Sequence, residues 1–405
     1  MANAYRQIFA VPGTAAFSSA GLVARLATAM TRFGIVAMLS QQPGEYALAG
    51  AVTATHAIAY ALVGPRLARA VDRHGQRRVL LPAAAVGAVA LTVLALCHRL
   101  AAPSWTLFLA AAVAGVIPNV GSMVRARWAE IFRGTDQLHP AYSLESVVDE
   151  TVFTLGPVLA IGLSTAFAPE AGLLAAAGLL ALGSWLLAGQ RATEPPVRPA
   201  ERVRSGSAIR NPGLPALVVT FLAIGAVFAS IEVITVAFAA ERGDKAMASW
   251  VLAVYAIGSA LAGLVYGGLT PRGTVRGRLL TGTLLMTVTM VPLLVTGNLL
   301  LLGVVLFVAG TACAPTMATA MGMVELAVPR GQLTEGMTWA STGLGLGIAL
   351  GAALAGAVVD RSGAGPAFAV PVACGALAVA AVLAGVRAVP RTPAEADPSP
   401  VAVSA

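Results

Sequence analysis

Long apolar runs alternate with short polar breaks along nearly the whole chain. A membrane-spanning helix needs about 20 consecutive apolar residues, and by that criterion the pattern predicts twelve spans. They lie near residues 17–39, 46–68, 79–97, 104–125, 142–167, 171–189, 214–240, 247–269, 279–296, 299–323, 337–359 and 366–386. Connections such as 98–103 and 168–170 are too short to hold a soluble domain. The pattern therefore predicts an all-α membrane protein with 12 transmembrane helices.

Arginine-rich loops all fall on one side of the predicted spans. These loops cover 66–78, 125–133, 191–210 and 272–278. An even number of spans puts both termini on that same side. Because basic loops are retained in the cytoplasm, we expect both termini to be cytoplasmic.

Composition agrees with a multi-pass membrane protein. Of the 405 residues, 58% are hydrophobic and only 11% are charged, whereas a soluble domain carries about 25% charged residues. The net charge of +8 could suggest a nucleic-acid partner, but the basic residues follow membrane sidedness instead, so no such partner is expected. Lys245 is the single lysine among many arginines, which is typical of a GC-rich bacterium. We therefore expect a bacterial plasma membrane location.

The spans divide into two equal groups. A linker rich in proline and arginine covers 191–212, between an N-terminal domain at 1–190 and a C-terminal domain at 213–390. Residues 391–405, rich in Pro, Ala and Ser, are expected to be disordered.

The two groups also repeat in sequence. At an offset of 199 residues, Ala61-Leu62-Val63-Gly64 aligns with 260–263, Arg73 with Arg272, and Arg77 with Arg276. At an offset of 195, Leu155-Gly156 aligns with Leu350-Gly351. The repeat predicts two pseudo-symmetric six-helix bundles.

The loop after the second span carries a specific motif. It reads Asp72-Arg73-x-Gly75-x-Arg77-Arg78 and resembles the loop between helices 2 and 3 of the major facilitator superfamily. Ala68 and Gln76 depart from the family pattern. The resemblance implies that Asp72 closes the cytoplasmic side through span 11 and an arginine of span 4, where Arg125 and Arg127 are candidates. The counterpart of Asp72 in the second half is Pro271, so we expect a one-sided clamp.

Span 5 carries a second motif. Leu155-Gly156-Pro157-Val158-Leu159 resembles the core of the motif found in antiporters of the same superfamily, the drug exporters especially. Gly allows close helix approach and Pro bends the helix, so the alternative is a packing kink at Gly156-Pro157 without bearing on transport direction. The mid-helix arginine that drug exporters commonly carry in span 4 is absent, since residues 114–119 read Ala-Gly-Val-Ile-Pro-Asn.

Charged residues inside the spans are the first candidates for function, because such groups pair, line water or titrate. Span 5 holds Glu145, Asp149 and Glu150, and span 1 holds Arg25 at a similar depth. We predict that Arg25 pairs with Asp149 or Glu150. The pair is either a structural salt bridge or includes a proton carrier.

A second predicted pair joins the outer halves of spans 1 and 7. Arg32 and Glu232 could form an outer gate, or Glu232 could bind a cationic substrate or a proton. Alternatively, each side chain extends separately to the membrane interface.

Other polar residues of the spans are candidates for lining a cavity or for holding helices together. These are Asn119 and Pro118 in span 4, and Thr311, Pro315 and Thr316 in span 10.

No catalytic, cofactor or metal-binding signature is found in the sequence. His56, His74, His98 and His139 are scattered, and no P-loop is present. We therefore expect neither an enzyme nor a cofactor.

Together the features predict a proton-coupled exporter of small amphipathic compounds, a monomer in the lipid bilayer with protons as coupling ion. The alternatives are an importer or uniporter of a nutrient, and a membrane receptor or scaffold without transport.

Overall fold

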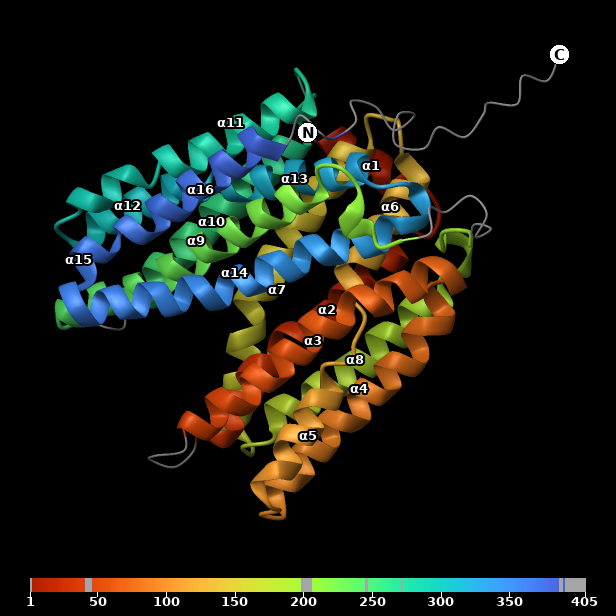
Figure 1. Cartoon of the computed structure of the whole chain (residues 1–405), viewed down its shortest axis with the longest axis horizontal. Coiled ribbons are helices and arrows are strands. Elements are labelled where there is room, and N and C mark those ends of the chain that lie inside the picture. The colour runs from red at the N-terminus through yellow and green to blue at the C-terminus, as the bar shows by residue number, and fades with distance from the viewer. Residues whose placement is uncertain are drawn as a thin grey trace. The chain divides into compact units, whose positions relative to one another are not determined.

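The computed structural model describes residues 2–40, 46–197, 206–244, 247–270, 272–385 and 389 (Figure 1). Within these residues the regular structure is helical, as predicted. Eleven helical segments are long and apolar enough to cross a membrane. The structure thus confirms the helical class and supports eleven of the twelve predicted spans.

Helices of the first half follow the predicted spans closely, except at the fourth span. They are α2 (Thr14–Leu39), α3 (Tyr46–His74), α4 (Gln76–Arg99), α5 (Ser104–Ala114), α6 (Val120–Phe132), α7 (Leu138–Ala166) and α8 (Ala171–Gly189). A short helix, α1 (Ala2–Ala10), precedes them, and the 3-10 helix η1 (Arg191–Thr193) follows.

The second half begins with the 3-10 helix η3 (Ala208–Arg210). Its longer helices are α9 (Leu214–Glu241), α10 (Met247–Gly267), α11 (Val275–Val288), α12 (Leu299–Gly310), α13 (Cys313–Ala327), α14 (Leu333–Ser362) and α16 (Ala369–Gly385). Short elements between them are η4 (Val291–Val295), η5 (Arg330–Gln332) and α15 (Ala364–Ala367). The predicted tail, 391–405, lies outside the described residues.

The predicted fourth span, 104–125, is not one helix. It is divided into α5 and α6, with residues 115–119 outside the helices. Pro118 has no backbone N–H to donate to the carbonyl of Ala114 and disfavours helical backbone at Ile117. At 11 residues, α5 is too short to span a bilayer by itself.

The contacts divide the chain into two compact units that differ from the predicted domains. The N-terminal unit comprises Phe9–Ile131 and Val148–Val197. The C-terminal unit comprises Met1–Ile8, Phe132–Val147 and Arg198–Ala405. Both α1 and α7 therefore contribute to two units. The domain limits drawn along the sequence, 1–190 and 213–390, stay predictions.

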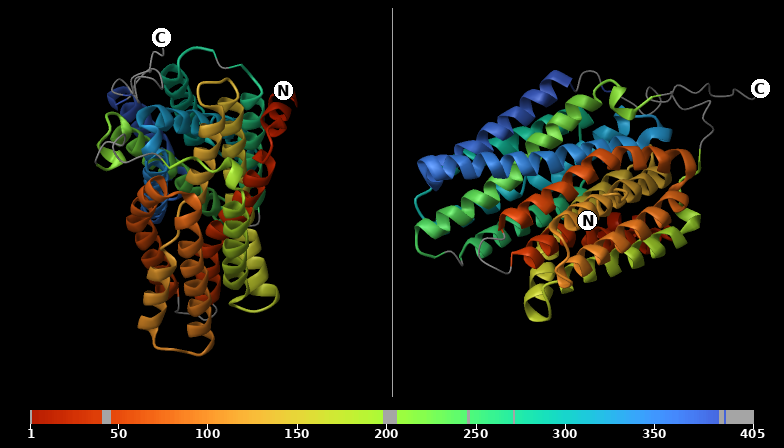
Figure 2. Two further views of the ribbon diagram at one scale, coloured as in Figure 1. Left: turned by 90° about the vertical axis from the view of Figure 1, so that its right-hand side faces the viewer. Right: turned by 60° about the horizontal axis from the view of Figure 1, so that its bottom comes forward.

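The same helix pairings occur in both units. In the N-terminal unit, α8 packs against α2 and α4, and α5 packs against α3 and α4. In the C-terminal unit, α16 packs against α9 and α11, and α12 packs against α10. Figures 1 and 2 show α4 beside α8, and α9 beside α14. The pairings follow the order of helices in the two sequence repeats.

Aligned glycines make equivalent contacts in the two units. A Cβ added to Gly156 of α7 would lie 2.6 Å from the Cβ of Ala29 in α2. A Cβ added to Gly351 of α14 would lie 2.3 Å from the carbonyl oxygen of Ala226 in α9. Both glycines let two helix backbones approach closely, and they occupy the positions that the 195-residue offset aligned.

A second equivalence was not predicted. Gly13 and Gly213 precede α2 and α9 with φ values of 87° and 85°, a conformation that favours glycine. A Cβ on Gly13 would lie 2.9 Å from Thr193, and one on Gly213 would lie 2.3 Å from Val389. Each unit therefore packs the start of its first long helix against the chain that follows its last one.

Candidate functional site

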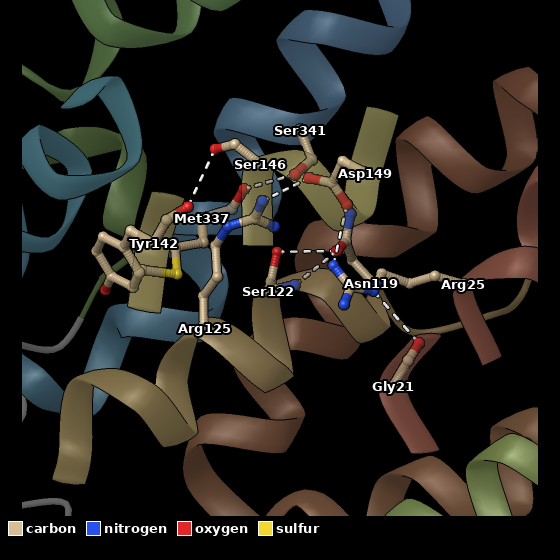
Figure 3. A network of polar contacts seen from close by, with 10 residues as sticks. All are labelled: Gly21, Arg25, Asn119, Ser122, Arg125, Tyr142, Ser146, Asp149, Met337 and Ser341. Carbon is tan, nitrogen blue, oxygen red and sulfur yellow. Dashed lines mark hydrogen bonds and ion pairs between the residues drawn. The ribbon is translucent and has the colours of Figure 1, made fainter. Parts of the chain in front are cut away.

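Asp149 of α7 lies between two guanidinium groups within the N-terminal unit (Figure 3). Arg25 of α2 approaches the Oδ1 atom of Asp149 at 3.0 Å. Arg125 of α6 forms an ion pair and hydrogen bond with the other oxygen, Oδ2. Arg25 was predicted to pair with Asp149 or Glu150, and the structure shows the ion pair with Asp149, which Arg125 joins.

Glycines make room for this charge cluster. The Nε atom of Arg25 donates to the carbonyl oxygen of Gly21 at 3.2 Å. A Cβ on Gly121 would lie 3.2 Å from Nη1 of Arg125 and 3.3 Å from Cδ of Arg25. An alanine at 121 would therefore require the side chains of Arg25 and Arg125 to shift slightly.

The charged groups of this cluster are largely buried, so their pairing matters for stability. The side chains of Arg25, Arg125 and Asp149 are 7%, 3% and 22% exposed. A buried charge that loses its partner is strongly destabilising. The carboxylate therefore holds α2 and α6 to α7 at the same time, and any change in its charge affects both contacts.

Asn119 lies at the break between α5 and α6. Its Oδ1 atom accepts from the backbone N–H of Ser122 at 2.8 Å and from the Ser122 hydroxyl at 3.0 Å, which caps the start of α6 (Figure 3). The Asn119 side chain also hydrogen-bonds Tyr60 of α3. Asn119, a candidate for lining a cavity or for holding helices together, therefore caps α6, and its role in a cavity stays a prediction.

The other acidic residues of α7 fall into different units. Glu145 is fully buried in the part of α7 that belongs to the C-terminal unit, whereas Glu150 is half-buried in the N-terminal unit. The sequence placed all three acidic residues on one helix. Their positions along that helix do not show which other helices each side chain contacts.

Arg32 and Glu232 belong to different units, so their predicted pairing stays a prediction. Arg32 is half-buried, with its guanidinium carbon 5.9 Å from the centre of the Phe33 ring. Glu232 is exposed on α9.

The loop that carries the Asp72–Arg78 motif, here called the motif loop, forms a tight turn between α3 and α4. Gly75 has φ 90° and donates its N–H to the carbonyl oxygen of Val71 at 2.9 Å. The backbone N–H of Arg77 donates to Oε1 of Glu194 at 2.9 Å. Around the turn Asp72 is half-buried, whereas Arg73 and Arg78 are exposed.

The two candidate partners of Asp72 have other contacts. Arg125 binds Asp149, as described above, and the fully buried Arg127 hydrogen-bonds the Gln76 Oε1 atom at 2.7 Å. Arg127 also donates to the Gln190 carbonyl at 2.7 Å and to the Thr193 hydroxyl at 2.9 Å. Arg127 thus joins α6 to α4 and to the chain after α8. No sequence pattern indicates this network, because two of its acceptors are an ordinary side-chain amide and a backbone carbonyl.

The remaining candidates contact their own helices. Thr311 and Thr316 donate to the carbonyls of Val308 and Ala312 at 2.7 and 2.6 Å. Pro157 lies inside α7, next to the closely packed Gly156. Among the described residues, no group of three or more His, Cys, Asp or Glu side chains is placed to hold a metal ion.

The comparisons with known proteins give the family. A family model described as Major Facilitator Superfamily matches residues 17–243 and residues 216–403. The chain belongs to the Major Facilitator Superfamily. It is therefore a multi-pass membrane transporter rather than an enzyme, and members of this superfamily bind small-molecule substrates within the membrane. No protein among the curated sequences matches this chain.

Solved transporter structures share the fold. The human organic anion transporter MFSD10 (TETRAN) matches with a TM-score of 0.71 and 17% identity, over 92% of this chain and 100% of that chain. A bacterial homologue of the iron transporter ferroportin, in an outward-facing state, has a TM-score of 0.71 and 15% identity, over 92% and 98% of the two chains. The superfamily transporter FucP, in an outward conformation, has a TM-score of 0.69 and 11% identity, again over 92% and 98%. The TM-scores show a shared fold, and at these low identities the cargoes of the three proteins carry no substrate over to this chain.

Proposed function

We propose that this superfamily member exports small amphipathic compounds in exchange for protons, by alternating access. The observation that supports proton coupling is the position of Asp149, a carboxylate within an apolar helix and between two arginines. The resemblance of Gly156-Pro157, about two turns further along α7, to the antiporter motif supports export.

In the proposed coupling, a proton competes with Arg25 and Arg125 for the carboxylate of Asp149. A proton on Asp149 removes the negative charge that Arg25 and Arg125 contact. Neutralising one partner of a buried ion pair weakens the pair strongly. Proton binding would therefore loosen the contacts of α7 with α2 and α6, and proton release would restore them. This links the protonation state to a rearrangement of helices.

The proposal places the transporter in a bacterial plasma membrane as a monomer, with both termini in the cytoplasm. The one-sided arginine loops support this orientation. The Asp72 loop is proposed to help close the cytoplasmic side.

The test has two stages. A sensitivity screen of a deletion strain against many toxic compounds supplies a substrate. Everted membrane vesicles with an imposed pH gradient then measure its flux. Uptake into these vesicles driven by an acidic interior supports proton-coupled export. Flux that ignores the pH gradient contradicts the proton coupling, and gradient-driven efflux in the opposite sense favours an importer.

A further inference from the structure

An apolar groove lies between α10 and α12 of the C-terminal unit. Its volume is about 320 Å³. From α10 it is lined by Trp250 and Val254, and from α12 by Leu300, Val304 and Phe307. Trp250 and Leu300 are 70% and 82% exposed. The groove is therefore open at the surface of the unit, and its walls are apolar.

A glycine gives the groove its depth. Gly303 lies on the α12 wall, and nothing lies within 4 Å of a Cβ added to it. A side chain at this position would extend into the groove, since its first carbon meets no neighbouring atom. The groove can therefore be filled by a single substitution that leaves the contact of α12 with α10 in place.

The guanidinium group of Arg242 lies near one end of the groove. Arg242 directly follows α9, and its guanidinium carbon is 3.3 Å from the centre of the Phe238 ring. Its Nε and Nη2 atoms donate to the carbonyl oxygen of Gly297 at 3.3 and 3.1 Å, and Nη1 donates to the Phe238 carbonyl at 3.3 Å. Gly297 is two residues before Leu299, a lining residue, so their Cα atoms are at most about 7.6 Å apart.

Arg242 keeps charge and N–H donors for a ligand. Its three bonds to carbonyl oxygens leave one N–H on each Nη atom. In the part of the chain that the structure describes, no carboxylate forms an ion pair with it. The adjacent acids accept from backbone N–H groups instead, Glu241 from Ala364 at 2.8 Å and Asp244 from Met247 at 3.3 Å. The arginine is therefore held in place by neutral groups, and its charge is available to an anion.

We propose that the groove between α10 and α12 binds one phospholipid, with an acyl chain between the two helices and the phosphate on Arg242. Arginine suits this role, because its planar fork of N–H groups matches the oxygens of a phosphate. Trp250 lies in the first turn of α10, and exposed tryptophans of membrane proteins gather at the level of the lipid headgroups. Guanidinium and phosphate are thus expected at the same depth.

Arg242 makes this groove a specific site. Acyl chains are as apolar as the side chains of the groove, so a bilayer covers any such surface without selecting a ligand. A fixed guanidinium at the end of the groove selects molecules that carry an anion at the end of an acyl chain. The inference does not depend on the direction of transport or on its coupling ion.

The test measures contact between a lipid chain and Trp250. Purified full-length protein in detergent is titrated with a phosphatidylglycerol whose acyl chains carry bromine, which quenches tryptophan fluorescence on contact. Saturable quenching is expected, and Trp250→Phe should remove it. Arg242→Gln should weaken binding at least about tenfold, since one hydrogen bond to a charged group is worth that much. Gly303→Leu should fill the groove and abolish the saturable quenching.

Two matched variants and one matched ligand are the controls. Gly178→Leu changes a glycine of α8 that also has nothing within 4 Å of an added Cβ, and Arg99→Gln removes an exposed arginine at the end of α4. Both variants should bind the brominated lipid as the wild type does. Brominated diacylglycerol has the same chains without the phosphate and should bind the wild type at least about tenfold more weakly.

Four results would overturn the lipid site. They are quenching that does not saturate, saturable quenching that persists in Trp250→Phe, tight binding by Arg242→Gln, and diacylglycerol that binds as tightly as phosphatidylglycerol. A dimer that Gly303→Leu dissociates, detected by light scattering, would instead make the groove an interface between copies. The diacylglycerol comparison uses the wild type, so it decides the question even if a variant fails to fold. No transport substrate or proton gradient is needed.

Discussion

The Nη1 atom of Arg25 lies 3.0 Å from Oδ1 of Asp149, and this ion pair joins α2 to α7. Arg125 adds a second guanidinium from α6. A single carboxylate thus connects three helices of the N-terminal unit. The predictions below test this connection, the glycine contacts that repeat in both units, and the motif loop.

Asp149→Asn should destabilise the protein. Breaking a buried ion pair from one side costs about 3–5 kcal/mol, and we expect the lower end because Asp149 is 22% exposed. The double variant R25Q/D149N should lose less stability than the two single variants added together, because residues in contact are not independent. Thermal unfolding of the purified protein in detergent measures this. Strictly additive losses would show that the pair is not coupled.

Gly156→Ala should disrupt the contact between α2 and α7. The new Cβ would lie 2.6 Å from the Ala29 Cβ, and overpacking of this kind typically costs about 1–3 kcal/mol. Gly162→Ala is the matched control in the same helix, since nothing lies within 4 Å of its added Cβ. Unfolding temperatures of the two variants make the comparison. Equal effects would mean that helix propensity, and not the contact with Ala29, decides the result.

The repeat predicts the same outcome in the C-terminal unit. Gly351→Ala should be as harmful as Gly156→Ala, because its Cβ would lie 2.3 Å from the Ala226 carbonyl oxygen. Gly356 has open space around it and is the control in α14. Yield and unfolding temperature of folded protein report the difference. A harmless Gly351→Ala would contradict the equivalence of the two glycines.

The clamp of the motif loop is predicted to be one-sided. Asp72→Asn should weaken closure of the cytoplasmic side, whereas Pro271→Ala should not, because Pro271 carries no charge. Pro271 lies outside the described residues, so this comparison rests on the sequence repeat. Accessibility of cytoplasmic cysteine probes, measured in both variants, tests it. Equal increases in accessibility in the two variants would contradict a one-sided clamp.

Much of the fold could be predicted from the sequence, because a bilayer requires long apolar runs and marks their sidedness with arginine. The break in span 4 could not. Gly115 and Pro118 were visible, but both residues are tolerated within membrane helices, so their presence alone does not predict an interruption.

The candidate site was predictable in part, because the apolar runs also indicate how deep each charged residue lies in the membrane. Depth along two apolar runs was enough to pair Arg25 with Asp149 or Glu150, and the structure shows the pair with Asp149. The role of Arg127 was not predictable, because its acceptors include backbone carbonyls that every residue possesses. An ion pair between Arg133 and Glu325 of α13 joins residues 192 positions apart, and only tertiary contacts show that segment 132–147 packs with the C-terminal unit.

The most direct test of the account is substrate flux driven by a pH gradient in everted vesicles. Wild-type protein is compared with Asp149→Asn at equal amounts of folded protein in the membrane, with Glu150→Gln as the control for loss of a neighbouring carboxylate. The account predicts that the acidic-interior gradient drives uptake in the wild type and in Glu150→Gln, and that Asp149→Asn abolishes this dependence on pH. Gradient-driven uptake that persists in folded Asp149→Asn would contradict it.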